Sequence, residues 1–209
     1  MATYRATKSG LAWEAQEKIN KSFDVDEAKK SLKWIASTSG EKIEINGIED
    51  REKMMMFFHS VLKDGMVLCR LVDALLLPQD KIDFSMKSFQ ETKLPAFQSA
   101  RERERIGIFL RKAKDYGVSE ANIFQTDNLY ERTNLVQVCN TIRALGVEAQ
   151  SKPGYSGEMV WPKKVEENRR TFSEDQLKAG LQIISLQYGT NKGASQAGMN
   201  FGKQRKILD

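Results

Sequence analysis

Apolar residues recur at every third or fourth position over much of residues 24–145, and no segment shows sustained alternation of apolar and polar residues. The first pattern is typical of amphipathic helices, whereas half-buried strands need the second. We therefore expect an all-α domain. A chain of 209 residues, 40% of them apolar, is long enough for one self-sufficient core with extensions.

The first expected helix has signals at both ends. Asp24 is the expected N-cap, with Glu27 reaching back to it as in a capping box, and Gly40 is the expected stop. A second helix should follow over residues 50–62, up to the break at Asp64-Gly65. The residues expected to face inward are Val25, Ala28, Leu32, Ile35 and Ala36 in the first helix, and Met54, Phe57, Phe58 and Val61 in the second.

Residues 66–77 are apolar nearly all round, which predicts a central helix buried on all sides. Its two charged residues, Arg70 and Asp73, are three positions apart and are expected to pair. After Pro78 we expect a loop-rich stretch that large side chains anchor in the core. These anchors are Phe84, Met86, Phe89 and Phe97.

Two further helices complete the expected domain. Residues 101–105 alternate in charge and predict an exposed helical start, followed by an apolar stripe that ends at Gly117. The last helix should run over residues 133–145, with Gly146 as its C-cap. The two stripes are Ile106, Phe109, Leu110, Ala113 and Tyr116, and then Leu135, Val138, Cys139, Ile142 and Leu145.

The chain divides into a helical domain flanked by other segments. After the domain, the sequence predicts a linker with a basic helix from Trp161 to Arg170 and a second short helix that Ser173 and Gln176 cap. The expected regions are an N-terminal extension (1–22), the helical domain (23–148), the linker with its two helices (149–183) and a basic, largely irregular C-terminal extension (184–209).

The segment from Gly189 to Lys206 cannot build a core. It holds four glycines and four basic residues but no aliphatic stripe, so ordering it would bury too little apolar surface to offset the backbone entropy. Residues 151–209 carry ten Lys and Arg against six Asp and Glu, whereas residues 1–150 carry 23 against 22. A basic extension on a near-neutral domain suits an acidic partner.

Signals for catalysis and for cofactor or metal binding are missing from the sequence. His59 is the only histidine, and Cys69 and Cys139 lie among apolar residues without the spacing of a zinc site or a disulfide framework. Neither a phosphate-binding loop nor an EF-hand loop is present. We expect no enzyme activity, no cofactor and two buried thiols. Without a signal peptide or a membrane-spanning stretch, we expect a cytoplasmic protein.

Several motifs in the expected domain resemble those of the calponin homology domain. They are LKWI at residues 32–35, LKDGMVLCRL at 62–71, IGIFLRKA with YGV over 106–118, and FQT with LYE over 124–131. Near the end, GTNKGASQAGM at 189–199 closely resembles the calponin-family repeat, although the repeat is one residue short between Met199 and Gly202. The order of one domain, one basic segment and one repeat resembles the calponin and transgelin family over residues 15–207.

This resemblance implies an F-actin-binding protein of the cytoskeleton that stabilises or cross-links filaments. A single domain of this kind often binds actin poorly alone, so the affinity is expected in the basic C-terminal part, where several weak ion pairs act together. The implied actin-binding residues are Lys163, Lys164, Arg169, Arg170, Thr190, Asn191, Lys192, Gly193, Ser195, Gln196, Met199, Lys203, Arg205 and Lys206.

Two other functions fit parts of the sequence. The domain could be an adaptor for signalling or cytoskeletal proteins, with phosphorylation of Ser173, Thr190 or Ser195 adding about −1.5 to −2 charges each and switching the tail. The sequence pI near 9.1 suggests nonspecific nucleic-acid binding, but no nucleic-acid motif is present. We expect neither a specific nucleic-acid partner nor a membrane span.

Overall fold

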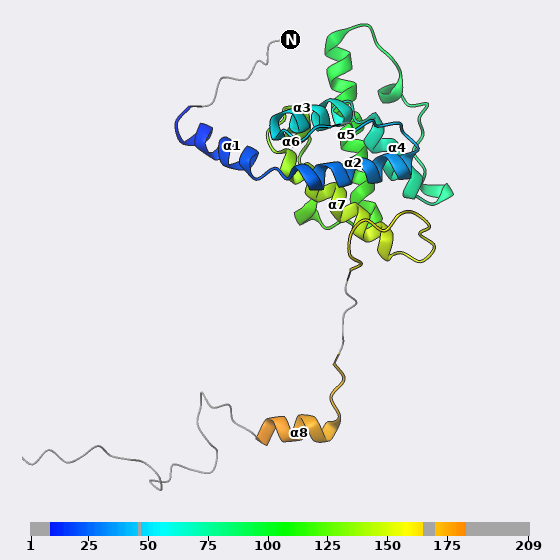
Figure 1. Ribbon diagram of the computed structural model, residues 1–209. Coiled ribbons are helices and arrows are strands. Elements are labelled where there is room, and N and C mark those ends of the chain that lie inside the picture. Colours follow the sequence, from blue (N-terminus) through cyan, green and yellow to red (C-terminus); the bar gives the residue numbers. More distant parts are fainter. Residues whose placement is uncertain (1–8, 46, 165–169, 183–209) are drawn as a thin grey trace, which may run out of the picture. The chain divides into compact units, whose positions relative to one another are not determined.

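The computed structural model describes residues 9–45, 47–164 and 170–182, and the chain forms two compact units, Met1–Lys164 and Val165–Asp209. Every regular element among the described residues is a helix, which confirms the all-α prediction (Figure 1). The first unit contains α1 (Leu11–Lys21), α2 (Val25–Ser39), α3 (Arg51–Leu62), α4 (Met66–Leu75), η1 (Pro78–Asp80), η2 (Lys87–Phe89), α5 (Pro95–Tyr116), η3 (Glu120–Asn122), α6 (Thr126–Tyr130) and α7 (Leu135–Ser151), and the second contains α8 (Glu174–Gln182).

Capping determines where α2 begins and ends. The Asp24 Oδ1 atom accepts hydrogen bonds from the backbone N–H groups of Asp26 and Glu27 at 2.9 and 3.2 Å. Gly40 closes the helix with a φ of 73°, in the left-handed region that glycine tolerates. Both predicted ends are therefore confirmed. The Glu27 carboxylate, however, does not return to the N-cap but accepts a hydrogen bond from the indole of Trp161.

Helix α4 packs mainly against α2 and α5, and it also contacts α3. Large side chains from the surrounding helices fill this core, and Trp34 of α2, Phe58 of α3 and Phe109 of α5 are all fully buried. Because buried apolar surface contributes roughly 25 cal/mol per Å², this cluster is the main source of stability.

Only one face of α4 is buried, so the prediction of burial on all sides is wrong. Leu68 and Leu71 are fully buried, whereas Ala74 is exposed. The helix ends at Leu75, before the predicted end at residue 77.

The two charged residues of α4 do not pair with each other, which corrects a second prediction. Arg70 forms an ion pair with Glu41, in the loop that follows α2. Asp73 pairs with Lys81 at 3.3 Å and accepts a hydrogen bond from the backbone N–H of Ile82 at 2.7 Å. Each of the two charged side chains therefore fastens a different loop to α4.

Helix α5 begins at Pro95, and its charged first half is not an exposed start as predicted. Glu102 and Arg105 are buried. The Arg105 guanidinium donates hydrogen bonds to the carbonyl oxygens of Asp64 at 2.5 Å and Ser88 at 2.8 Å. A buried arginine needs such partners, and here it joins α5 to the turn before α4 and to η2.

The loop between α4 and α5 is anchored by other residues than expected. Ile82 and Ser88 are buried, and Phe89 packs against the core as predicted. Three predicted anchors are exposed instead, namely Phe84, Met86 and Phe97.

Helix α7 starts at an Asn134 cap, whose side chain accepts a hydrogen bond from the Gln137 N–H at 3.1 Å, and it continues to Ser151. Gly146 lies inside this helix, so the predicted C-cap is wrong. Instead of ending the helix, Gly146 leaves room for the ring of Trp161.

Helix α8, in the second unit, begins as predicted. The Ser173 Oγ accepts from the Gln176 N–H at 3.3 Å, and the Ser173 N–H donates to Gln176 Oε1 at 3.0 Å. This reciprocal pair is the expected capping box.

Both cysteines are free and buried, as expected. Burial raises the pKa of the Cys69 thiol to about 12 and raises the pKa of the Cys139 thiol as well. Because the thiolate is the reactive form, neither cysteine is suited to nucleophilic chemistry at neutral pH.

The only histidine should titrate below its ordinary range. His59 is partly buried, with Nε2 3.3 Å from the carbonyl oxygen of Tyr130; burial is the main cause that lowers its pKa, and Lys63 and Arg132 lower it further. In a pH titration followed by ¹H NMR, we expect the His59 C2–H signal to shift with a midpoint below pH 6.5 in the folded chain and near pH 6.5 in urea. Because the unfolded chain then binds the proton more tightly, the free energy of unfolding should fall as pH drops below 6.5. A folded-state midpoint at or above 6.5 would contradict this.

Candidate functional site

The first part of the predicted linker folds back onto the domain. We call residues 152–164 the strap. The Tyr155 hydroxyl accepts a hydrogen bond from the indole of Trp34 at 2.9 Å and donates one to the carbonyl oxygen of Glu158 at 3.1 Å. Since Trp34 is fully buried in α2, these bonds tie the strap to the core, and it belongs to the same compact unit as the helices.

Trp161 is the main anchor of the strap, with only 6% of its surface exposed. Its ring meets the ring of Trp34 edge-on, with centroids 5.3 Å apart and planes at 73°. Its Nε1 donates to the Glu27 carboxylate at 2.6 Å. The buried amide of Gln150, oriented to suit its neighbours, donates to the Trp161 carbonyl and accepts from the Val160 N–H. The apolar ring of Trp161 is thus packed against another ring, and its indole N–H and backbone carbonyl both have hydrogen-bond partners.

Gly146 makes this packing possible. A Cβ atom at this position would lie 2.3 Å from Cζ3 and 2.5 Å from Cε3 of the Trp161 ring, far closer than van der Waals contact allows. Any larger residue at position 146 would displace the ring. The glycine that the sequence suggested as a helix stop is therefore a contact surface for Trp161.

The strap brings two of the predicted basic residues to the surface directly after this anchor. Lys163 is exposed and forms no ion pair with any residue that the structure describes. The Lys164 N–H donates to the Ser151 Oγ at 3.3 Å, and its ammonium pairs with Glu148 of α7 at 2.8 Å. Lys163 is therefore the freer charge of the two.

The predicted basic helix from Trp161 to Arg170 is wrong where the structure describes it. Residues 161–164 and Arg170 are not helical, because the chain there follows the surface of the domain up to Lys164 instead of forming its own turns. Arg170 is exposed. Residues 165–169, with the predicted Arg169, lie outside the described residues.

Arg143 of α7 is a basic residue near the strap that sequence reasoning missed. It lines a shallow cavity of about 440 Å³ together with Lys164 and Glu148. Its guanidinium lies 4.0 Å from Glu27, and half of its side chain is exposed. The sequence pattern could have placed Arg143 on the polar face of α7. That it lies near Lys164, however, depends on how the strap folds.

Of the other predicted site residues, the structure places Ser173, which is exposed and caps α8. The positions that lie outside the described residues are Thr190, Asn191, Lys192, Gly193, Ser195, Gln196, Met199, Lys203, Arg205 and Lys206.

The described residues also bear on metal binding and on membrane insertion. Within the described ranges, no group of three or more His, Cys, Asp or Glu side chains is arranged to hold a metal ion. No helix in the part of the chain that the structure describes is both long and apolar enough to span a bilayer.

Comparison with known proteins identifies the kind of domain. A model of the calponin homology (CH) domain matches residues 25–151, which is more than half of the chain, and a model of the calponin family repeat matches residues 184–207. Myophilin from Echinococcus granulosus is 40% identical over 201 residues, covering 96% of each chain. The chain belongs to the calponin family.

Within this family, a calponin homology domain and a calponin repeat are typical of actin-binding proteins of the cytoskeleton. The solved calponin-homology domain of Rng2 from Schizosaccharomyces pombe shows a weaker likeness, with 19% identity, a TM-score of 0.46, and coverage of 82% of this chain and 92% of that one. A likeness of that size carries no weight for function. The matched CH domain ends at residue 151, whereas the packed unit continues to Lys164.

Substitution of Gly146 tests the contact with Trp161. An alanine inside a helix ordinarily stabilises by roughly 0.5–1 kcal/mol relative to glycine. We expect Gly146→Ala to lower the free energy of unfolding instead, because the new methyl group overlaps the ring. Gly107→Ala in α5 is the matched control, since a Cβ there meets nothing within 4 Å and should raise it. Urea denaturation measures both; equal stabilisation by the two would contradict the packing.

Removal of the ring itself should cost far more. Trp161→Ala leaves a cavity beside Trp34 and removes the indole hydrogen bond to Glu27, so we expect a loss of about 3–5 kcal/mol in the free energy of unfolding. Trp13→Ala in α1 is the control, because that side chain is 55% exposed, and its loss should stay within about 0.5 kcal/mol. Similar losses for both variants, measured by urea denaturation, would show that the strap is not anchored.

Proposed function

We propose that this chain binds F-actin through its basic C-terminal part, residues 163–207, and stabilises or cross-links filaments in the cytoplasm. The observation that carries the proposal is the match of the calponin repeat to residues 184–207, in a chain whose net positive charge is concentrated after residue 150. Polymerised actin exposes an acidic surface, to which such a segment is complementary.

The described residues support a particular division of labour. The domain up to residue 150 is nearly neutral, and the strap that follows it carries the exposed Lys163 next to its last residue. The basic segment therefore begins at a fixed point, since Trp161 fastens the chain two residues earlier. Fixing one end reduces the conformational entropy that binding must overcome.

Binding through such charges should be modest and sensitive to salt. Exposed ion pairs contribute roughly 0–1 kcal/mol each, so several must act together. The Debye length of about 8 Å at physiological ionic strength screens them further. Cross-linking needs two actin sites on one particle, and a second site on the domain or a second copy of the chain would supply it.

Cosedimentation with F-actin tests the proposal. We expect the full chain to pellet with filaments at low salt. A variant with Lys163, Lys164, Arg169 and Arg170 changed to Ala should bind about tenfold more weakly, because each lost contact costs a fraction of a kcal/mol. Removal of residues 189–209 in addition should abolish pelleting. A low-speed spin of the same samples then separates bundling from simple decoration.

The matched control removes the same charge from the domain. Lys53, Lys87, Lys93 and Arg111 are exposed, and changing them to Ala should leave pelleting nearly unchanged. If the two fourfold variants lose binding equally, net charge rather than the C-terminal segment attracts the filament. If the tail variants pellet as well as the full chain, the helical domain carries the site and the proposal is wrong. If the full chain fails to pellet at low salt, the adaptor function takes its place.

A further inference from the structure

Helix α1 leaves one of its sides uncovered. It lies at the edge of the first unit (Figure 1), and none of its residues is buried. The Gln16 side chain donates a hydrogen bond to the carbonyl oxygen of Thr133 at 2.9 Å, so this side of the helix faces the domain. The partly buried residues of α1 are Gln16, Glu17, Ile19 and Asn20. The other side of the helix is open to a partner.

A continuous stripe of exposed residues runs along that open side. It consists of Leu11, Glu14, Ala15 and Lys18, whose spacing of three or four positions places them on one face of a helix. Leu11 is 84% exposed, more than any other large apolar side chain among the described residues. Ala15 lies near the middle of the stripe, and its small side chain lets another helix approach closely.

The charged residues of α1 are divided along its length. Glu14 and Glu17 lie in the first half of the helix, and Lys18 and Lys21 lie in the second. None of the four forms an ion pair with any residue that the structure describes, whereas the glutamate and lysine four positions apart in α8 lie 3.9 Å from each other. Their charges are therefore available to a partner.

This division makes the helix complementary to a second copy of itself. Two α1 helices laid antiparallel bring the acidic half of each against the basic half of the other, whereas a parallel pair would bring like charges together. An antiparallel arrangement also opposes the two helix dipoles. The pattern of charge thus selects both the occupant of the open side and its direction.

The stripe fits such a pair in detail. When the two Ala15 residues meet at the two-fold axis, Glu14 of one copy and Lys18 of the other are offset by only about 3 Å along the axis, because each residue rises about 1.5 Å. The same pair of charges recurs on the other side of the axis. Because the stripe faces away from the domain, the two domains lie on the outside of the pair, and the contact closes at two copies.

We propose that α1 is a self-association surface, through which two copies of this chain pair in antiparallel orientation. Two faces of 11-residue helices bury far less than the roughly 1,200–2,000 Å² of a stable interface, so we expect a dissociation constant on the order of 0.1–1 mM. Copies bound side by side reach effective concentrations of about that size. Pairing then supplies two basic C-terminal segments to one particle, and this consequence alone rests on the proposed actin binding.

The pairing is measured first without actin, on the full chain. Amide signals in ¹⁵N NMR should shift over a range of about 0.05–1 mM chain, with the shifts confined to α1, and sedimentation velocity should report an approach to two copies. Shifts that do not depend on concentration would mean that a second copy does not cover the stripe. Shifts centred on another surface would equally overturn the proposal.

A charge swap identifies the partner helix and its direction. Glu14→Lys and Lys18→Glu should each abolish pairing, because each brings like charges together twice. An equal mixture of the two variants should pair again, since both contacts are then attractive. Glu104→Lys and Arg111→Glu make the same charge changes at exposed positions of α5, and each alone should pair as the unaltered chain does. A mixture that fails to pair, or equal loss in the α5 variants, contradicts the antiparallel contact.

Cross-linking tests the two-fold axis with a different readout. Both native cysteines are buried, so Ala15→Cys supplies the one exposed thiol. With oxidised glutathione as the oxidant, it should form a disulfide-linked dimer at least about tenfold faster than Ala100→Cys, which is exposed on α5. Equal rates would overturn the proposal.

The consequence for filaments is tested separately. We expect Glu14→Lys to pellet with F-actin at high speed but to lose pelleting of bundles at low speed. If the unaltered chain does not bind filaments at all, the proposed function fails while the pairing measured without actin stands. If it binds and Glu14→Lys bundles equally well, α1 does not supply the second site.

Discussion

The contact between Trp161 and Gly146 determines how far the folded domain extends. The ring fits only because α7 has no side chain at that point, and its indole then reaches Glu27 at the start of α2. One aromatic residue thus joins the first and last long helices of the domain to a segment that lies outside the matched CH domain. Without it, the strap would be held by hydrogen bonds and an ion pair alone, such as those of Tyr155 to Trp34 and of Lys164 to Glu148.

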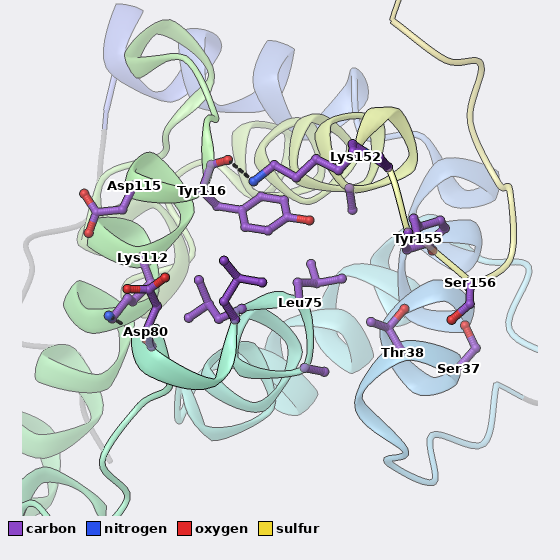
Figure 2. Close-up of a pocket in the computed structure, with 17 residues that line it drawn as sticks. Ser37, Thr38, Leu75, Asp80, Lys112, Asp115, Tyr116, Lys152, Tyr155 and Ser156 are labelled. Atoms are coloured by element: carbon purple, nitrogen blue, oxygen red, sulfur yellow. Dashed lines mark hydrogen bonds between the residues drawn. The ribbon is translucent and has the colours of Figure 1, made fainter.

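The same contact connects two parts of the surface of the first unit. On the C-terminal side of Trp161, the chain reaches the surface at Lys163, where the basic segment begins. On its N-terminal side, the strap forms one wall of a cavity of about 880 Å³ at the ends of α2, α4, α5 and α7 (Figure 2). Loss of the anchor would therefore alter both places at once.

Local signals in the sequence predicted the fold well where the relevant hydrogen bonds join residues close in the chain. The caps at Asp24 and Ser173 and the stop at Gly40 are of this kind. Predictions failed where a partner came from a distant segment. Arg105 looked solvent-exposed from its charged neighbours, yet its partners Asp64 and Ser88 lie on other elements and bury it.

The candidate site, too, was predictable only in its local features. The exposure of Lys163 and Lys164 follows from their charge and was predictable. The strap was not, because a proline and glycine-rich stretch is typical of a linker, and the space at Gly146 that the Trp161 ring fills arises only in the folded domain. The cavity was equally hidden, since four helices contribute one turn each and no single segment carries its pattern.

The strap also has a mechanical consequence. If a filament holds the C-terminal segment, tension enters the first unit at Lys164, and the bond between Lys164 and Glu148 is the first to be loaded. Such an exposed ion pair is weak. The next resistance is Trp161, which must leave its place between two helices before any helix is pulled. Since Trp161 belongs to the buried core, load reaches α2 and α7 through the packing of this one ring.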